Sequence, residues 1–139
     1  MIVIADSGST KCSWAICDSS GQIVDRCSTI GFNPYFITST KVYKHLEDSD
    51  LKEIKDNITE VYFYGAGCSS KKMNAIIEKP FAEFFSKAEI NVHHDLDAAC
   101  YSMYEGKPAI TGILGTGSNS CYFDGETIYE NAPSLGFML

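Results

Sequence analysis

Hydrophobic and polar positions alternate in short blocks from the start of the chain. An apolar run ends in Asp6, the small polar residues of 7–10 follow, and the chain then becomes apolar again. Short apolar runs separated by a tight turn predict two strands joined as a β-hairpin, over 2–6 and 11–18. We expect Gly8 to take the positive φ that such a turn uses, because glycine has no Cβ to forbid it.

The pattern continues as further strands and then as alternating helices and strands. The elements expected are strands at 22–29, 61–64 and 90 to 93 or 94, and helices at 38–51, 69–87 and 96–104. Thr38 or Ser39 caps the first helix, and Pro80 is expected to bend or split the second. Three strands followed by strand–helix units predict an α/β fold, a mixed five-stranded sheet with helices on its faces.

From residue 109 the pattern of the opening repeats. Strands are expected at 109–114, 120–124 and 126–130, and a turn of Gly, Thr, Ser and Asn fills 115–119 between the first two. Such a repeat indicates a duplicated architecture whose second copy has only begun. We therefore expect residues 1–105 to form one lobe and 106–139 to be the truncated start of a second, similar lobe.

Composition narrows the classes of function. The 139 residues carry a net charge of −7, so the chain has no basic face for nucleic acid. None of the six cysteines stands in a Cys-x-x-Cys arrangement, which argues against a zinc site. No apolar run has the length of a membrane span, and the chain opens directly on a strand rather than on a leader. We expect a cytoplasmic protein.

The turns at 6–11 and 115–119 carry the candidate chemistry. Each offers several backbone N–H groups and hydroxyls at one point, a combination that binds phosphate, and Asp6 adds a carboxylate that can hold Mg²⁺ through water. Either turn alone is as typical of an ordinary polar hairpin as of a phosphate site. Two turns in matching positions favour a site that grips the β- and γ-phosphates of ATP from opposite sides of a cleft.

Five ordered motifs resemble the superfamily of acetate and sugar kinases, Hsp70 and actin. They are DSGSTK at 6–11, GFNP at 31–34, HDLDAA at 94–99, GTGSNS at 115–120 and SLGFML at 134–139. Within the superfamily, the chain is most similar to N-acetylglucosamine kinases and to the BadF/BadG/BcrA/BcrD-type ATPases. The resemblance implies a ribonuclease H-like, actin-like ATPase fold whose second lobe binds ATP, with Mg²⁺ as cofactor and a sugar as substrate.

The resemblance also implies roles for individual residues. Asp6 would hold Mg²⁺ through water, Asn33 would bind sugar hydroxyls, and Asp95 would be the general base for the sugar hydroxyl. The residues expected to contact ATP phosphates are Ser7, Gly8, Ser9, Thr10, Lys11, Gly115, Thr116 and Gly117. Further sugar contacts are expected from Ser118, Asn119, Ser134 and Leu135, although the family often carries an aromatic residue near Leu135.

Two aspartates compete for the role of the base. Asp95 follows a strand, at the carboxyl edge where ligands of parallel sheets bind. A base in phosphoryl transfer mainly orients the hydroxyl, so a rigid strand end suits it. Asp97 instead suits the first turn of the next helix, where the helix dipole favours a negative charge. This comparison favours Asp95.

Other candidate residues have plain structural readings. Asn33 is also typical of a turn before proline, and Lys11 of a solvated strand end. His93 and His94 are neighbours in a strand and point to opposite faces, which argues against a metal pair. Cys68 is more typical of a packed thiol than of a reactive one.

These observations favour an ATP-dependent kinase of N-acetylglucosamine or a related sugar. Two alternatives stay open: an ATPase that activates a reductase or dehydratase, like the benzoyl-CoA reductase activators, and a sugar-binding relative without turnover. We expect this chain to be a piece of a longer protein and to be inactive alone. Unpaired edge strands in an unfinished lobe predict a homodimer. The sequence does not identify the sugar.

Overall fold

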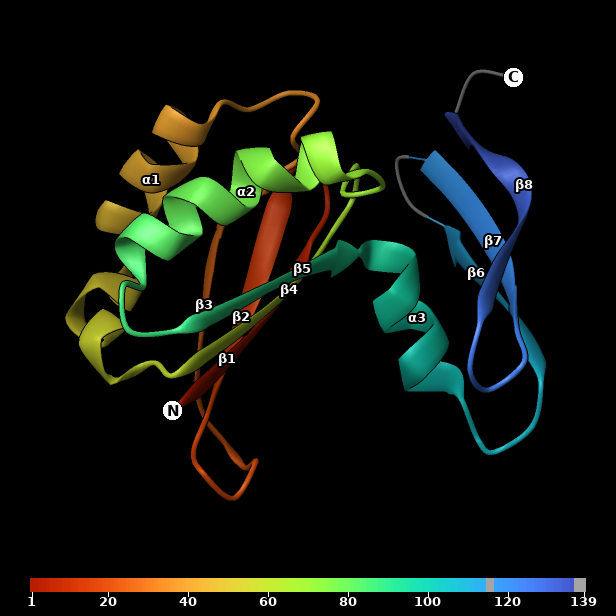
Figure 1. The fold of residues 1–139 in the computed structure, drawn as a ribbon, viewed down its shortest axis with the longest axis horizontal. Helices are drawn as coiled ribbons and strands as arrows, with labels where there is room; N and C mark the ends of the chain where they lie inside the picture. The colour runs from red at the N-terminus through yellow and green to blue at the C-terminus, as the bar shows by residue number, and fades with distance from the viewer. Residues whose placement is uncertain (115–116, 137–139) are drawn as a thin grey trace. The chain divides into compact units, whose positions relative to one another are not determined.

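The computed structural model describes the backbone of residues 1–114 and 117–136, and the side chains of 1–114 and 118–130. The chain forms two compact units, Met1–Asp95 and Leu96–Leu139, and each is described by itself (Figure 1). None of the helices in the described part of the chain is long and apolar enough to cross a membrane.

The first unit is built on a five-stranded sheet with the strand order β3-β2-β1-β4-β5. Its elements are β1 (Ile2–Ser7), β2 (Lys11–Cys17), β3 (Ile23–Ile30), α1 (Ser39–Glu47), the 3-10 turns η1 (Asp50–Glu53) and η2 (Lys55–Asn57), β4 (Glu60–Gly65), α2 (Lys71–Phe84) and β5 (Glu89–His94). Strands β1, β4 and β5 run parallel, whereas β2 pairs antiparallel with both β1 and β3. The predicted mixed sheet is confirmed.

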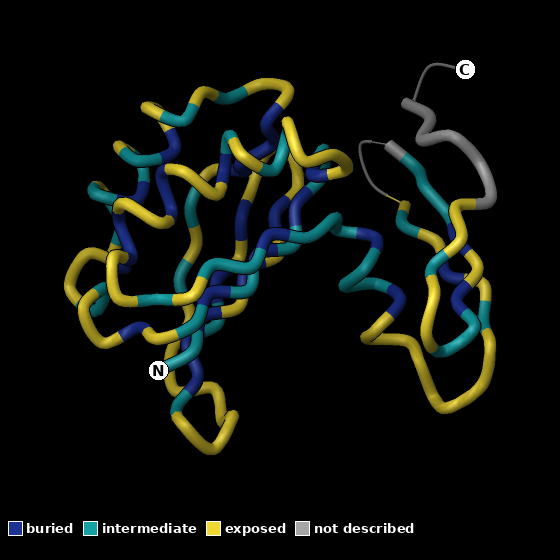
Figure 2. The backbone as a smooth tube through the Cα atoms, in the orientation of Figure 1, coloured by how far each residue is buried: buried dark blue, intermediate teal, exposed yellow. Residues whose placement is uncertain are grey.

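Helices α1 and α2 cover one face of this sheet, and the core lies between them and the strands (Figures 1 and 2). Every second residue of β1, β2 and β4 is buried on that face. At its centre the ring of Phe81 lies 5.1 Å from Phe63, 5.8 Å from Trp14 and 6.2 Å from Phe32 between centroids. Each such aromatic pair contributes about 1 kcal/mol beyond its buried area.

Pro80 was expected to bend or split this helix. It lies inside α2, which runs unbroken from Lys71 to Phe84, so the proline does not split it. Proline has no N–H, and the carbonyl four residues earlier therefore loses its helical donor. That carbonyl belongs to Ile76, and the Ser39 hydroxyl of α1 donates to it at 2.8 Å. The hydroxyl supplies the missing hydrogen bond and ties the two helices together.

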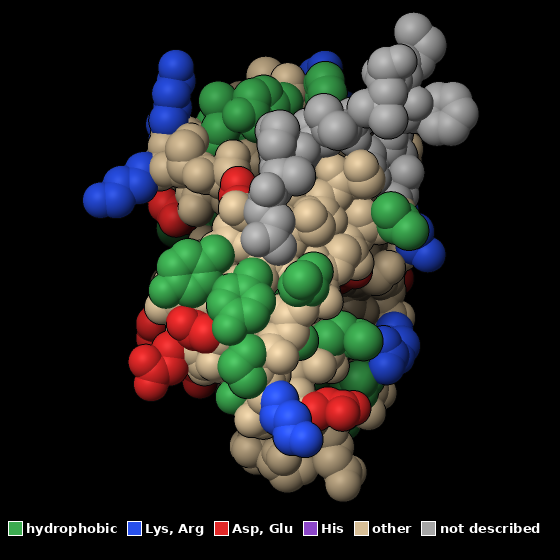
Figure 3. All heavy atoms as spheres, turned by 90° about the vertical axis from the view of Figure 1, so that its right-hand side faces the viewer, with side chains coloured by type: hydrophobic (Ala, Val, Ile, Leu, Met, Phe, Trp, Pro, Cys, Tyr) green, Lys and Arg blue, Asp and Glu red, His purple; other side chains and the backbone are tan. Residues whose placement is uncertain are grey.

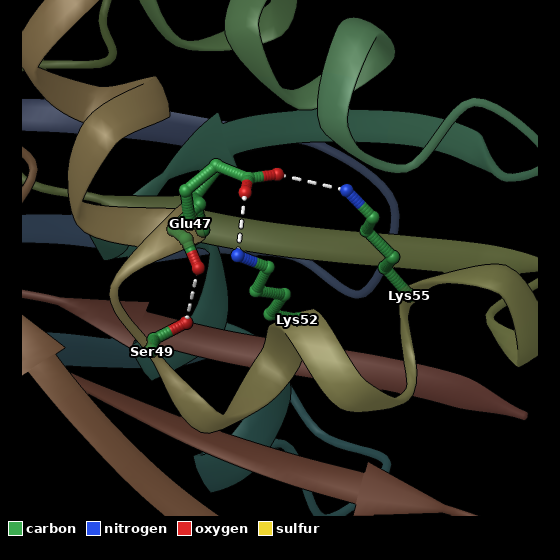
Figure 4. A network of polar contacts seen from close by, with 5 residues as sticks. Glu47, Ser49, Lys52 and Lys55 are labelled. Carbon is green, nitrogen blue, oxygen red and sulfur yellow. Dashed lines mark hydrogen bonds and ion pairs between the residues drawn. The ribbon is translucent and has the colours of Figure 1, made fainter.

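Helix α1 begins at the predicted cap, where Thr38 Oγ1 accepts from the backbone N–H of residue 41 at 3.4 Å. It ends at Glu47, short of the predicted end at 51. The Ser49 hydroxyl donates to a carbonyl of the last turn at 2.7 Å and so competes with continued helix. The Glu47 carboxylate then holds Lys52 at 3.2 Å and Lys55 at 2.8 Å (Figure 4), which shapes the short turns leading into β4.

The second unit contains a helix and a small antiparallel sheet of order β6-β7-β8. Its elements are α3 (Asp95–Met103), β6 (Ala109–Leu114), β7 (Gly117–Phe123) and β8 (Ile128–Gly136). The expected turn at 115–119 is too long, because Ser118 and Asn119 already pair with Leu114 and Ile113 in the ladder. The predicted strand at 126–130 likewise extends to Gly136.

The two faces of the small sheet differ. Cys121 and Phe123 are buried against Leu96 and Cys100 of α3, as expected for a sheet with one covered face. On the opposite face Ile110 and Leu114 are 76% and 90% exposed. Figure 3 shows hydrophobic side chains on the surface among charged ones in this view.

An aspartate closes the second turn of each three-strand meander. Asp18 Oδ1 accepts from the hydroxyl and the backbone N–H of Ser20 at 2.6 and 2.8 Å, and Asp124 Oδ1 accepts from the backbone N–H groups of Thr127 and Glu126 at 2.7 and 2.8 Å. The Ser20 hydroxyl lowers the pKa of Asp18 below its ordinary value, and the Thr127 N–H does so for the pKa of Asp124. The repeat predicted from the sequence therefore includes the aspartate that closes the second turn of each copy.

Replacing Ser39 by alanine should lower the free energy of unfolding by about 1–3 kcal/mol, because the Ile76 carbonyl loses its donor. Urea denaturation measures the change. The neighbouring Thr40, which is exposed, is the matched control, and its replacement by alanine should stay within about 0.5 kcal/mol. In a Pro80→Ala background the backbone N–H returns, and the serine should matter less. An equal cost in both backgrounds would contradict this account.

Protonation of Asp18 should destabilise the first unit. Its pKa is lowered from 3.8 in the folded chain, so its contribution is complete above the unfolded pKa and is lost as the pH falls through the lower folded value. We expect Asp18→Ala to destabilise the chain at neutral pH and to flatten the acid limb of its stability curve. Urea midpoints at a series of pH values measure this, and a variant whose acid limb matches that of the unchanged chain would contradict the prediction.

Candidate functional site

The carboxyl ends of the three parallel strands form one edge of the first unit. Ser7 at the end of β1 is in register with Gly65 at the end of β4, and Gly65 with His94 at the end of β5. Asp95 follows directly. Neighbouring strands lie about 4.8 Å apart, which places the ends of β1 and β5 roughly 10 Å from each other. The first turn and the candidate base thus share one edge, at which ligands of open α/β sheets bind.

The first turn is exposed and closed by a single backbone hydrogen bond. Gly8 N donates to Lys11 O at 3.0 Å, and every residue from Gly8 to Lys11 is exposed. Gly8 does not have the positive φ that we expected. The hydrogen bond from Gly8 N to Lys11 O closes this turn without a left-handed conformation at Gly8.

Ser7, one of the expected phosphate ligands, has a fully buried side chain. Its Oγ accepts from the backbone N–H of Phe32 at 2.8 Å and donates to Gly8 O at 3.2 Å. Its carbonyl accepts from Ala66 N at 2.8 Å. Ser7 therefore holds the segments at 31–36 and 65–68 against the first turn through hydrogen bonds. Its hydroxyl helps to fix the conformation of the turn.

Asn33 lies against this turn with both ends of its amide engaged. Nδ2 donates to Ser9 Oγ at 3.0 Å, and Oδ1 accepts from Tyr35 N at 3.0 Å. The residue is only 8% exposed. An asparagine amide offers two donors and two lone pairs, so each end retains the capacity for one further partner. The structure thus brings together the residue expected to bind sugar and the turn expected to bind phosphate.

Two glycines allow this close packing. A Cβ on Gly31 would overlap the Gly8 carbonyl oxygen and would stand 2.6 Å from the carbonyl carbon of Ser9 and 2.7 Å from Thr10 N. A Cβ on Gly67, whose φ is +81°, would stand 2.5 Å from Asn33 Oδ1. Real Cβ atoms do not approach this closely, so glycine is required at both positions.

Asp6 projects on the face of the sheet opposite to α1 and α2. It is exposed, and its neighbours in register are Ser13 on β2 and Tyr64 on β4. The Tyr64 ring in turn stacks on His93 with centroids 5.3 Å apart. Among the described residues no group of three or more His, Cys, Asp or Glu side chains could hold a metal directly. A single exposed carboxylate suits a magnesium ion that keeps most of its waters.

Asp95 is the first residue of α3 and contacts the histidine that precedes it. His94 Nε2 lies 3.2 Å from Asp95 Oδ1, and the two side chains are 17% and 21% exposed. Asp97 also lies in the first turn of this helix, as expected. Cys68 has a pKa raised to about 12, chiefly by burial and then by the Asp95 charge, so it is a packed thiol rather than a reactive one.

The remaining expected site residues belong to the second unit. Gly115 and Thr116 lie outside the described residues, and Gly117, Ser134 and Leu135 are described by their backbone alone. Leu135 is in register with Ser118 across β7 and β8, so two of the motifs meet in this sheet. Asn119 is half-buried, and its Oδ1 accepts from Ser120 N at 2.9 Å.

Sequence reasoning missed three residues that shape the site. Gly31 and Gly67 are needed for their lack of a Cβ, and the GFNP motif and the Gly-Ala-Gly run contain the only signal for them. His94 was considered as a metal ligand, whereas the structure shows it beside Asp95. Nothing in a strand pattern indicates which neighbour a terminal histidine will contact.

Comparison with known proteins agrees with this architecture. Neither a family model nor a curated protein sequence matches the chain. A solved structure of a candidate N-acetylglucosamine kinase from Porphyromonas gingivalis matches with a TM-score of 0.90 and 34% identity, over 100% of this chain and 50% of that one. The chain therefore has the fold of the actin-like ATPases and sugar kinases, and the predicted resemblance to N-acetylglucosamine kinases is confirmed. It spans about half the length of that relative.

Two more distant structures share the fold. A candidate N-acetylglucosamine kinase from Chromobacterium violaceum has a TM-score of 0.65 and 16% identity, over 93% of this chain and 47% of that one. The inorganic polyphosphate/ATP-glucomannokinase from an Arthrobacter species has a TM-score of 0.61 and 20% identity, over 94% of this chain and 61% of that one. At these identities the likeness shows the fold alone.

Replacing Gly31 by alanine should lower the free energy of unfolding by about 1–3 kcal/mol, because the new methyl group meets backbone atoms of the first turn. It should also shift the side-chain amide signals of Asn33, whose contact with Ser9 depends on the same approach. NMR and urea denaturation measure the two effects.

The matched control for Gly31→Ala is Gly8→Ala in the same turn. An added Cβ there has Lys11 O at 3.8 Å as its nearest neighbour, and the φ of Gly8 is not positive. We expect this variant to keep its stability within about 0.5 kcal/mol. Equal losses in the two variants would contradict the close approach at Gly31.

Proposed function

We propose that the protein containing this chain transfers the γ-phosphoryl group of MgATP to a hydroxyl of N-acetylglucosamine or a close relative. The observation that carries the proposal is the hydrogen bond of 3.0 Å between Asn33 Nδ2 and Ser9 Oγ. It joins the candidate sugar residue to the candidate phosphate turn, at the edge that also carries Asp95. The 34% identity to a candidate N-acetylglucosamine kinase supports the choice of sugar.

In this proposal the first turn binds phosphate mainly through its backbone. Gly8, Ser9, Thr10 and Lys11 are exposed, and their N–H groups and the Lys11 charge suit an anion in an otherwise acidic chain. The buried Ser7 hydroxyl holds the shape of the turn. Asp6 would hold Mg²⁺ through water, and a bound magnesium ion neutralises charge on the phosphates.

Asn33 and Asp95 would position the sugar. The contacts of Asn33 to Ser9 and Tyr35 fix the plane of its amide before any ligand arrives, which lowers the cost of ordering it. Asp95 would accept the proton of the attacking hydroxyl as general base. Its Oδ1 lies 3.2 Å from His94 Nε2, and this contact orients the carboxylate that would receive the hydroxyl proton.

We further propose that residues 106–139 begin the second, ATP-binding lobe, in which Gly115, Thr116 and Gly117 contact phosphate. Ser118, Asn119, Ser134 and Leu135 would add sugar contacts from that lobe. A cytoplasmic location and a homodimer stay predictions.

The cysteines argue against the alternative of an ATPase with a bridging iron–sulfur cluster. Such a cluster needs thiolates at an exposed surface between subunits. Five of the six cysteines are buried, and Cys27 is half-buried.

The proposal is tested by a coupled assay of ATP consumption on the longest natural form of the protein that contains this chain. N-acetylglucosamine, glucose and no sugar are compared. We expect consumption to depend on N-acetylglucosamine, and Asp95→Asn to lower kcat by about 10²–10⁴ because the general base is lost. The KM for ATP should change little.

Asp97→Asn is the matched control, since Asp97 shares the first turn of α3 with Asp95. We expect it to keep most of the activity. Full sugar-dependent turnover in Asp95→Asn would reject Asp95 as the base, and ATP consumption that ignores every sugar would reject the kinase itself.

A further inference from the structure

The second unit contains two cysteines whose sulfur atoms are in direct contact. Cys100 Sγ of α3 and Cys121 Sγ of β7 lie 2.7 Å apart and are 21 residues apart in the sequence. The two residues are 1% and 0% exposed. Both are free thiols in this structure, and a disulfide bond of about 2.05 Å needs only a small further approach.

The two cysteines belong to the hydrophobic cluster of the second unit. Among the residues whose side chains are described, the buried cluster of this unit consists of Leu96, Cys100, Cys121 and Phe123. Two of these four residues are therefore the contacting thiols, and they join a helix to a strand. The rings of Tyr101 and Tyr104 pack on Phe123 of the same cluster, with centroids 5.9 and 5.0 Å from that of Phe123.

We propose that Cys100 and Cys121 are an oxidation site that closes into a disulfide bond and staples α3 to β7. The oxidant is a low-molecular-weight disulfide such as oxidised glutathione. One thiol, as thiolate, attacks the oxidant, forms a mixed disulfide and releases one reduced thiol. The second thiolate then attacks the protein sulfur, forms the S–S bond and releases the other. The protein loses two hydrogen atoms, and one oxidant molecule becomes two thiols.

The burial of the pair determines how fast this reaction runs. The pKa of Cys100 is raised to about 12, chiefly by burial and then by the neighbouring Cys121, so little thiolate forms while the unit is closed. Among the described residues, the buried cluster of this unit contains four side chains and is far smaller than that of the first unit, so we expect α3 to open locally. Oxidation therefore proceeds through local opening of α3 from the sheet and should speed up in mild urea.

The bond would act on the proposed site, a consequence that rests on the proposed function. Helix α3 begins at Asp95, and β7 carries Ser118 and Asn119. A staple between these two elements fixes the helix that starts at the candidate base against a strand of the second lobe. Formation of the bond itself does not depend on kinase activity, so the two proposals fail separately.

The test is to incubate the full chain with excess oxidised glutathione, block the remaining thiols and map its disulfides by mass spectrometry. We expect a Cys100–Cys121 linkage as the main product, with Cys68 still reduced. Hydrogen exchange should then slow by about a hundredfold in α3 and β7, because the cross-link removes conformations from the open state. The protection should disappear with a reductant.

Variants provide the controls. Cys68→Ala removes a buried cysteine of the first unit, and it should leave linkage and protection unchanged. Cys121→Ala should abolish both and leave Cys100 either reduced or joined to glutathione. The wild-type map is decisive even if this variant fails to fold. Oxidation that joins other cysteines, or that stops at mixed disulfides in the unchanged chain, would overturn the proposal.

Discussion

The hydrogen bond from Phe32 N to Ser7 Oγ is the contact on which the first unit's working edge depends. At 2.8 Å and fully buried, it holds the segment that follows β3 against the end of β1. The Phe32 ring enters the aromatic core beside Trp14, Phe63 and Phe81, while the next residue, Asn33, faces the first turn. Two adjacent residues therefore link the most tightly packed part of the unit to its candidate site. A buried hydroxyl without its partner carries a full desolvation cost, which makes this link costly to break.

The same core connects the site to the helical layer. Phe81, which packs on Phe32, follows Pro80 in α2, and the carbonyl freed by that proline is satisfied by Ser39 of α1. The position of Phe81 depends on α2 staying regular, and α2 stays regular because α1 supplies a donor. Rigid packing of this kind suits a site whose chemistry is mainly positioning, because an error of about 1 Å in geometry already costs much of the rate. The exposed first turn supplies the groups for a ligand, and the buried layer fixes where they stand.

Most of the fold could be read from the sequence because strands and helices of this chain follow clear hydrophobic periods. Strands β1 to β5 lie near their predicted ranges, whereas the spatial order of the strands was not predicted and comes from the structure. The predictions that failed concern local features of the chain. Pro80 was expected to bend or split α2, and the tertiary contact from Ser39 explains why the helix is not split there. Gly8 was expected to have a positive φ, whereas glycine is required at Gly31, by a close approach between segments distant in sequence. The hydrogen bond between Asn33 and Ser9 could likewise not be predicted, since a sequence motif gives residue types but not their hydrogen-bond partners.

The two units share the design of their three-strand meander, whereas their described buried clusters differ in size. Both copies close their second turn with an aspartate that caps backbone N–H groups, Asp18 and Asp124. The turns of the two copies are thus closed in the same way. The units differ in the helices and buried side chains that cover each sheet. The first sheet is covered by two helices over a large aromatic core. The second is covered by one helix, and the buried cluster among its described side chains has four members, two of them thiols. Since burial of apolar area dominates stability, a covalent cross-link between α3 and β7 would add to a unit in which the described apolar cluster is small.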